Sequence, residues 1–371
     1  MTRLLVVDDS ALMRRVLGEV FQNEAGFEVA FARDGVEALE RLHAFEPDVV
    51  TLDVQMPRMH GLDCLDRIMV ERPCPVVMVS SQTAEGADAT LEALQLGAVD
   101  FVAKPDGAVS LALDDFAPIL IEKVKMAAAS RLRRSHRLAE RIRALHGAAE
   151  PQPPPVTPKL KPKIRTRLTA SRSPASDGAP PGLVIIGTST GGPPALDTVL
   201  SAIPADFPWP ILVAQHMPAA FTASLARRLD GLCALEVIEV TRPMPLVAGH
   251  IYIARGDADM TVSRRSAGPV ALPVPSSPEY RWHPSVDRLV ASAAATMPSD
   301  RLVGVLMTGM GNDGARTMAD LRAAGGQTIA ESEHTAVIWG MPGELVKADG
   351  ADVVAPLGEI AERILDMVGA G

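Results

Sequence analysis

Cysteine, aromatic residues and long apolar runs are all scarce in this chain of 371 residues. The three cysteines, Cys64, Cys74 and Cys233, follow no regular spacing. They argue against a disulfide framework or a cysteine metal site and favour a reducing compartment. Aromatic residues make up 4% of the chain, so its cores must consist mainly of aliphatic residues and methionine. No apolar run reaches the ~20 residues of a membrane span, and the first residues are not typical of a signal peptide. We therefore expect a cytoplasmic protein without direct membrane insertion.

Basic residues are concentrated in one part of an otherwise acidic chain. The formal net charge is −9, yet residues 131–172 hold 12 Lys and Arg against two acids. This stretch has no interleaved aromatic residues and no nucleic-acid-binding motif, so it predicts a solvated linker and no nucleic-acid partner. Nine prolines in residues 151–181 agree, because such a segment buries too little apolar surface to offset its ordering entropy. We expect one domain over 1–130, a helical extension and basic Pro-rich linker over 131–181, and a second domain over 182–371.

Apolar strands alternate with helical patterns in the first domain. The strand candidates are LLVVDD, FEVAFA, VVTLD, PVVMVSS and AVDFVAK. Five such βα units predict an α/β domain whose parallel sheet is covered by helices on both faces.

The second domain repeats this alternation on a larger scale. Its candidates for parallel strands are LVIIG, WPILVAQH, ALEVIEV, RLVGVLMTG, QTIAES and DVVAP. Between the third and the fourth, the segments GHIYIA, DMTVS and VALPV predict a short antiparallel insertion. The fold class expected is therefore a doubly wound α/β domain with a mostly parallel sheet.

Polar residues end four strands of the first domain. In chain order they are Asp8 and Asp9, Asp53, Ser80, and Lys104. The carboxyl ends of parallel strands meet at one edge of the sheet, where functional groups collect. Three carboxylates there repel one another unless a cation joins them, and Mg²⁺ prefers such oxygen ligands. Asp53 could act as a nucleophile towards a phosphoryl group, with Lys104 and the Ser80 hydroxyl on the phosphoryl oxygens.

The motifs LLVVDDS, DVVTLDVQMPRMHGLDCL, PVVMVSS and GAVDFVAKP resemble those of response-regulator receiver domains. The resemblance implies a flavodoxin-like fold with strand order 2-1-3-4-5. It also implies that a histidine kinase phosphorylates Asp53, with Mg²⁺ held by Asp8, Asp9, Asp53 and the Gln55 carbonyl. His60 stands where an aspartate is usual in this family.

A glycine-rich turn follows the first strand of the second domain, in VIIGTSTGGPPAL. A serine nucleophile, a phosphate cradle and a simple turn could each explain it. The phosphate cradle is disfavoured because no lysine lies nearby. A nucleophile at Ser189 would need a base and an orienting carboxylate. His216 and Asp313 both follow later strands, so one sheet edge can gather all three residues.

The motifs IIGTSTGGPPAL, VAQHMP, RWHPSVDRLVAS, GVLMTGMGNDGA and MPGE resemble the catalytic domain of the chemotaxis protein-glutamate methylesterases. The resemblance implies a nucleophile, a general base and acid, its orienter, and three neighbours that line the site: Ser189, His216, Asp313, Met310, Thr190 and Gly191. The backbone N–H of Met310 would form part of the oxyanion hole. Arg255, Asp259, Trp282 and His283 depart from the family's common residues, in stretches expected to flank the substrate groove.

Together these features predict a phosphorylation-activated esterase for glutamate γ-methyl esters on chemoreceptors, which also deamidates certain glutamines. Its esterase would need no cofactor, and its receiver would use Mg²⁺. The alternative is a non-enzymatic output module that binds a partner when Asp53 is phosphorylated. We also expect the unphosphorylated receiver to pack over the groove at Ser189 and block it.

Overall fold

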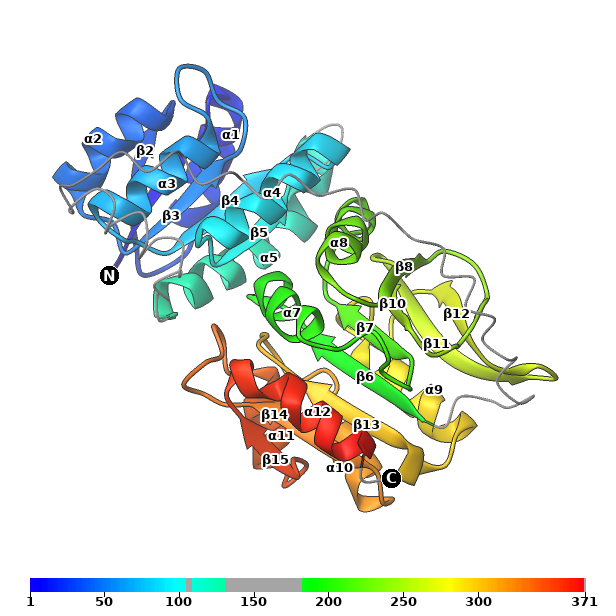
Figure 1. Ribbon diagram of the computed structural model, residues 1–371. Coiled ribbons are helices and arrows are strands. Elements are labelled where there is room, and N and C mark those ends of the chain that lie inside the picture. The colour runs from blue at the N-terminus through cyan, green and yellow to red at the C-terminus, as the bar shows by residue number, and fades with distance from the viewer. Residues whose placement is uncertain (105–108, 131–181, 370–371) are drawn as a thin grey trace, which may run out of the picture.

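The computed structural model describes residues 1–104, 109–130 and 182–369. The helical extension and linker expected over 131–181 lie outside these ranges. Two α/β units follow one another along the chain (Figure 1). Within the described ranges, no helix is both long and apolar enough to span a bilayer.

The first unit is a five-stranded parallel sheet with helices on both faces. Its strands are β1 (Thr2–Val7), β2 (Phe27–Ala32), β3 (Val49–Asp53), β4 (Val76–Ser80) and β5 (Asp100–Ala103). Its helices are α1 (Ala11–Gln22), α2 (Gly35–Phe45), α3 (Gly61–Glu71), α4 (Ala84–Leu96) and α5 (Val109–Ala129). The strand order is β2-β1-β3-β4-β5, which confirms the order expected from the sequence. Alternate residues of β1 serve opposite faces: Leu5 packs with α2 and α3, and Leu4 packs with α1 and α5.

The second unit is built on seven parallel strands. These are β6 (Leu183–Thr188), β7 (Ile211–Gln215), β8 (Glu236–Val240), β10 (His250–Ala254), β13 (Leu302–Leu306), β14 (Gln327–Glu331) and β15 (Val353–Ala355). Their order is β15-β14-β13-β6-β7-β10-β8. The helices are α7 (Gly192–Ser201), α8 (Ala219–Leu232), α9 (Val286–Thr296), α10 (Ala315–Ala323), α11 (Met341–Lys347) and α12 (Ile360–Gly369). Short 3₁₀ turns, η1 (Ser299–Arg301) and η2 (Leu357–Glu359), complete it.

The insertion after β8 differs from the prediction in one strand. A small antiparallel sheet is present, but it consists of β9 (Met244–Pro245), β11 (Ala258–Arg265) and β12 (Gly268–Pro275). The segment GHIYIA was expected in it and is instead β10, which pairs in parallel with β7 and β8. Four consecutive residues of β10, from Ile251 to Ala254, are buried. Burial on both faces suits an inner strand of a parallel sheet. The sequence prediction was wrong because a short apolar run does not by itself show whether its strand lies in a parallel or an antiparallel sheet.

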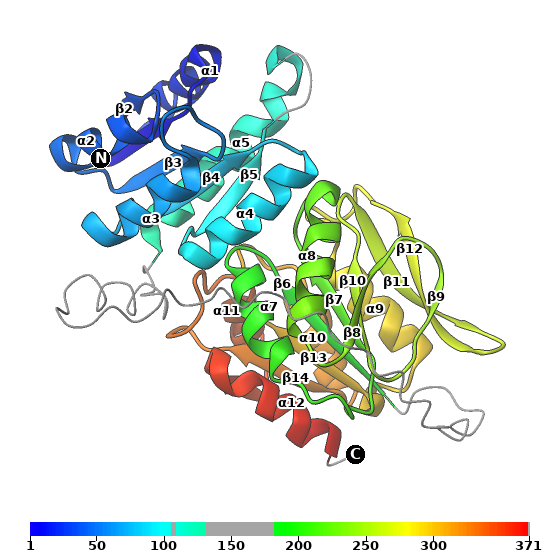
Figure 2. The same cartoon turned by 45° about the horizontal axis from the view of Figure 1, so that its top comes forward.

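The two units touch through α4 and β5 of the first and α7 and α8 of the second (Figures 1 and 2). The rings of Phe101 on β5 and Phe221 on α8 have centroids 4.5 Å apart. Beside them, Gln95 donates a 2.7 Å hydrogen bond to Asp197, which Arg228 also contacts at 3.1 Å. An apolar centre with a polar rim is the usual anatomy of a specific protein interface. Strand β5 also reaches the turn that carries Ser189, because the hydroxyl of Thr190 donates to Asp100.

Candidate active site

The Ser189 turn joins β6 directly to α7. The Ser189 N–H donates to the carbonyl of Thr308 at 3.0 Å, and the Ser189 carbonyl accepts from Gly192 at 2.8 Å. Gly191 has a φ of +77°, in the left-handed region that glycine occupies without strain. At Gly192, a Cβ would lie 2.0 Å from the side-chain oxygen of Gln215. The glycines therefore let the chain turn sharply against β7 and leave Ser189 partly exposed at the sheet edge.

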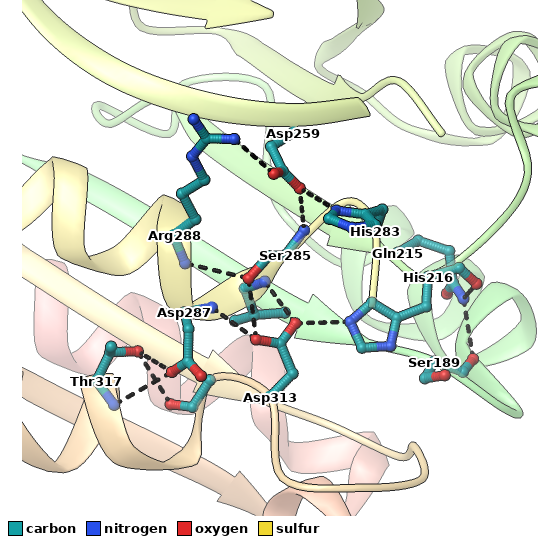
Figure 3. Close-up of polar contacts among 12 residues, drawn as sticks. Ser189, Gln215, His216, Asp259, His283, Ser285, Asp287, Arg288, Asp313 and Thr317 are labelled. Carbon is teal, nitrogen blue, oxygen red and sulfur yellow. Dashed lines mark hydrogen bonds and ion pairs between the residues drawn. The ribbon is translucent and has the colours of Figure 1, made fainter. Parts of the chain in front are cut away.

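His216 follows the neighbouring strand β7 and is nearly buried. Its N–H donates to the Thr188 carbonyl at 3.0 Å, which fixes its backbone beside the end of β6. Its ring Nε2 lies 2.8 Å from Asp313 Oδ2 (Figure 3). The other ring nitrogen, Nδ1, is buried and has no hydrogen-bond partner among the residues that the structure describes. An imidazole that donates from Nε2 has an unprotonated Nδ1, which can accept a proton.

Asp313 receives four hydrogen bonds at the start of α9. Besides His216, its donors are the Val286 N–H at 2.7 Å, the Asp287 N–H at 2.9 Å and the Ser285 hydroxyl at 3.1 Å. Burial alone would raise the pKa of Asp313, but His216 and the two N–H groups hold it below its ordinary value. The amino end of a helix favours a negative charge for the same reason. Asp313 is therefore an ionised carboxylate that fixes the imidazole of His216.

Asp287 is the neighbouring acid, and its carboxylate points towards Thr317 and not towards His216. Its Oδ1 accepts the Thr317 hydroxyl at 2.7 Å, while only its backbone N–H reaches Asp313 (Figure 3). Burial and the nearby charge of Asp313 raise the pKa of Asp287. The structure thus assigns the contact with His216 to Asp313 and not to Asp287.

The turn expected to form the oxyanion hole lies against Ser189. A Cβ at Gly309 would lie 2.8 Å from the Ser189 Cβ, so the two backbones approach closely. The N–H of Met310, the next residue, donates to no acceptor in the described part of the chain. An N–H that is free beside a nucleophile can stabilise an oxyanion.

Thr190 and Gly191, expected to line the site, face the first unit. The Thr190 hydroxyl donates to Oδ2 of Asp100, the first residue of β5. A Cβ at Gly191 would lie 2.7 Å from Val337, which itself packs against the receiver core formed by α1 and α5. Thr190 is therefore engaged by the other domain in this conformation, a contact that the sequence did not predict.

Asp259 proves to brace the site, and Ser285 was not anticipated. Asp259 is fully buried and binds the His283 ring and the Ser285 N–H, both at 2.8 Å, and Arg288 at 2.7 Å (Figure 3). Burial would raise the pKa of Asp259, but His283, Ser285 and Arg288 together lower it. Ser285 in turn donates to Asp313. In the sequence, only the HPSVD motif pointed to these contacts, because Asp259 and Asp313 lie far from it along the chain.

The structure brings the acidic residues of the first unit together as expected. Ligand oxygens of Asp8, Asp9 and Asp53 lie within 4.8 Å of one another. Lys104 Nζ lies 2.8 Å from Asp53 and 2.9 Å from Asp8. Burial raises the pKa of Asp53, although Lys104 opposes the shift. Burial would lower the pKa of Lys104, but the two carboxylates raise it above its ordinary value.

Ser80 and Gln55 lie at the same edge with different orientations. The Ser80 hydroxyl donates to the Gly86 carbonyl in α4 at 3.1 Å and does not contact Asp53 in this structure. The Gln55 N–H lies 3.4 Å from Asp53 Oδ1, which places the Gln55 backbone beside the acidic cluster.

Fold and site together define the class of protein. An α/β domain with a serine, a histidine and an aspartate at one sheet edge follows a domain with an acidic cluster of the kind that accepts a phosphoryl group. A family model described as CheB methylesterase matches residues 184–364, and one described as response regulator receiver domain matches residues 4–112. The strand order of the first unit is the one expected of a receiver domain.

Two relatives are similar over nearly their whole length. One, from Rhodopseudomonas palustris (strain BisB18), is named protein-glutamate methylesterase/protein-glutamine glutaminase 2 and is 54% identical, covering 99% of this chain and 98% of the relative. The other, from Rhodospirillum rubrum, is named protein-glutamate methylesterase/protein-glutamine glutaminase 3 and is 51% identical, covering 98% and 95%. The chain belongs to the family of protein-glutamate methylesterases/protein-glutamine glutaminases, which confirms the resemblance drawn from its motifs.

The two neighbouring acids give a matched test of which carboxylate serves His216. Asp313→Asn should lower ester turnover about a thousand-fold or more, because an amide favours the imidazole tautomer with the proton on Nδ1. Asp287→Asn keeps the backbone N–H and the Thr317 contact, so its turnover should stay within about three-fold of wild type. Steady-state methanol release from both folded variants is the measurement. Equal losses in the two variants would contradict the assignment.

Proposed function

We propose that this chain hydrolyses the γ-methyl esters of glutamate residues on the cytoplasmic helices of methyl-accepting chemoreceptors and deamidates certain glutamines there. The observation that carries the proposal is the buried His216, which is bound to Asp313 through Nε2 and has Nδ1 available at the sheet edge where Ser189 lies. A nucleophile, a base and an orienter at one edge suit acyl transfer.

Acylation would begin at Ser189. Its hydroxyl oxygen attacks the ester carbonyl carbon while its proton passes to Nδ1 of His216. The carbonyl oxygen becomes an oxyanion, which the Met310 N–H and the amino end of α7 stabilise. The bond from carbon to the methoxy oxygen then breaks. That oxygen takes the proton from the imidazolium, and methanol leaves.

Deacylation would repeat the sequence with water. His216 removes a proton from the water, whose oxygen attacks the acyl carbon. The tetrahedral intermediate expels the Ser189 oxygen, which recovers its proton from His216, and glutamate is released. With glutamine as substrate, ammonia leaves in the first step in place of methanol. Asp313 remains ionised throughout and stabilises the imidazolium.

The receiver is proposed to control this chemistry through phosphorylation of Asp53 by a histidine kinase. Three clustered carboxylate oxygens balanced by one lysine fit a hard divalent cation, so Asp8, Asp9, Asp53 and the Gln55 carbonyl would hold Mg²⁺. When bound, Mg²⁺ would neutralise charge on the phosphoryl oxygens. Lys104 lies within reach of the same oxygens, and Ser80 could turn from Gly86 towards them.

The unphosphorylated receiver is proposed to restrict access to Ser189. Supporting this, Asp100 binds the hydroxyl of Thr190, the residue next to the nucleophile. Phe101 packs on Phe221 beside that bond. A protein substrate needs a wide approach to Ser189, so a domain seated on Thr190 would exclude it. Phosphorylation would then favour a conformation in which this contact is lost.

The nucleophile assignment is tested by Ser189→Ala. Methanol release from methylated receptor membranes should fall by about 10⁴- to 10⁶-fold, because the variant lacks the hydroxyl that is proposed to form the acyl-enzyme. The thermal unfolding midpoint should be nearly unchanged, since Ser189 donates no side-chain hydrogen bond within the described ranges. A folded variant with near-wild-type release would refute the esterase mechanism. It would favour the alternative of a non-enzymatic output module.

The blocking contact is tested by Asp100→Ala without phosphodonor. Loss of the bond to Thr190, a hydrogen bond to a charged group, should raise the unphosphorylated rate about ten-fold. The variant also removes the 3.0 Å ion pair of Asp100 with Lys123, which lies within the receiver and does not reach the esterase domain. The matched control is Asp88→Ala, which removes only the exposed 3.4 Å ion pair with Arg227 across the same interface and should change the rate little.

The phosphorylated rate completes this test. Asp100→Ala and wild type should have similar rates in Mg²⁺ and a small phosphodonor. Asp53→Ala should remain at the low rate under those conditions. An unphosphorylated rate in Asp100→Ala no higher than that of Asp88→Ala would contradict blocking by this contact.

A further inference from the structure

An indole ring lies parallel to the imidazole of His216. The ring of Trp282 has its centroid 6.1 Å from that of His216, and the two planes differ by 6°. Among the described residues, the His216 side chain has one hydrogen-bond partner, Asp313 at Nε2, which fixes a direction but leaves the ring free to rotate about it. A flat ring beside it can restrain that motion. Trp282 is half-buried, so it is partly shielded from solvent.

Trp282 also contacts the turn proposed to hold the oxyanion. A Cβ at Gly311 would lie 2.5 Å from the indole ring, and Gly311 has a φ of +82°. Glycine is thus required there both for its backbone angle and for the space that the indole fills. Gly311 directly follows Met310, so one side chain packs against both the base and the oxyanion turn.

The segment that carries Trp282 is anchored directly after the indole. His283, the next residue, binds Asp259 at 2.8 Å. Ser285 is also fixed, because its N–H donates to Asp259 and its hydroxyl donates to Asp313, the carboxylate that binds His216. Two buried carboxylates therefore fix the backbone from which the indole projects. A side chain mounted in this way holds its place better than one on a loose loop.

The outer side of the indole is also engaged. The guanidinium carbon of Arg281 lies 5.0 Å from the Trp282 ring centroid, within the range of a cation–π interaction. Arg281 forms a 3.0 Å ion pair with Glu122 on α5 of the receiver.

We propose that Trp282 is a positioning residue for ester hydrolysis: its indole holds the His216 imidazole in the plane that proton transfer from Ser189 requires, and packs the oxyanion turn beside it. The inference rests on the proposed function and adds a residue to it. Because the indole acts through His216, its loss should lower kcat more than it changes KM for the receptor substrate. A small misplacement of a catalytic group can cost up to about a hundred-fold in rate.

The experiment compares Trp282→Leu and Trp282→Phe in the full chain, activated with Mg²⁺ and a small phosphodonor. Trp282→Leu keeps apolar bulk without a flat ring, and kcat for methanol release should fall about 10- to 100-fold with KM within about two-fold. Trp282→Phe retains a flat ring and should recover kcat to within about three-fold of wild type. The matched control is Tyr280→Leu, which removes an aromatic ring from the same segment. Among the described residues, that ring has no contact with His216, and kcat should not change.

Each outcome decides one question. A Trp282→Leu enzyme with wild-type kcat overturns the positioning role. A raised KM with unchanged kcat also overturns it and makes Trp282 a substrate contact instead. Equal losses in the Leu and Phe variants indicate a merely structural role and overturn it as well. If wild type itself releases no methanol beyond the Ser189→Ala background, the proposed function fails, and that result is distinct from the other three.

Discussion

The esterase domain depends on one buried carboxylate, Asp313, and on the four donors that surround it. An ionised carboxylate is costly to bury unless each of its oxygens is hydrogen-bonded. Here the amino end of α9 supplies two N–H groups, Ser285 supplies a hydroxyl and His216 supplies a ring N–H. The same contacts that keep the charge buried also fix the His216 imidazole and the start of α9. Stability and catalytic geometry are therefore set by one interaction.

The brace around Asp259 extends this arrangement outwards. Asp259 holds the chain on either side of Pro284, and this segment leads to Trp282 and Arg281. Arg281 reaches Glu122 on the receiver. The contacts thus form a continuous series from a receiver helix to the proposed base. The bond between Thr190 and Asp100 and the ion pair between Arg281 and Glu122 are two distinct contacts of the receiver with the surroundings of the site.

Strand β5 connects the acidic cluster of the receiver with its interface to the esterase domain. Its first residues, Asp100 and Phe101, meet the esterase domain, and Lys104 just beyond its other end pairs with Asp53. Helix α4 has a similar arrangement, since Gly86 near its start accepts from Ser80 and Gln95 near its end binds Asp197. A change at the acidic cluster can therefore act on both elements that form the interface.

Much of this was predictable, for a physical reason. Strand ends are local features, and parallel strands bring them to one edge, so Ser189, His216 and Asp313 could be placed together from sequence. The acidic cluster followed from the same rule, whereas the strand order of the receiver was expected only from the resemblance of its motifs to receiver domains. Strand β10 was misplaced because an apolar run does not reveal its neighbours.

The contacts of Asp259, Ser285 and Trp282 were not predictable, and neither was the bond between Thr190 and Asp100. They join residues far apart in the chain, whose proximity only the folded packing determines. The HPSVD motif that contains Pro284 and Ser285 does not by itself identify the partners of these residues.

The most direct test of the central claim is the tautomer of His216. In protein with ¹⁵N-labelled histidine, the His216 signals can be assigned by comparison with a His216→Gln variant. At a pH where the ring is neutral, the account predicts a protonated Nε2, hydrogen-bonded to Asp313, and an unprotonated Nδ1. A neutral His216 with its proton on Nδ1 would contradict the account, because that nitrogen could not accept the proton of Ser189.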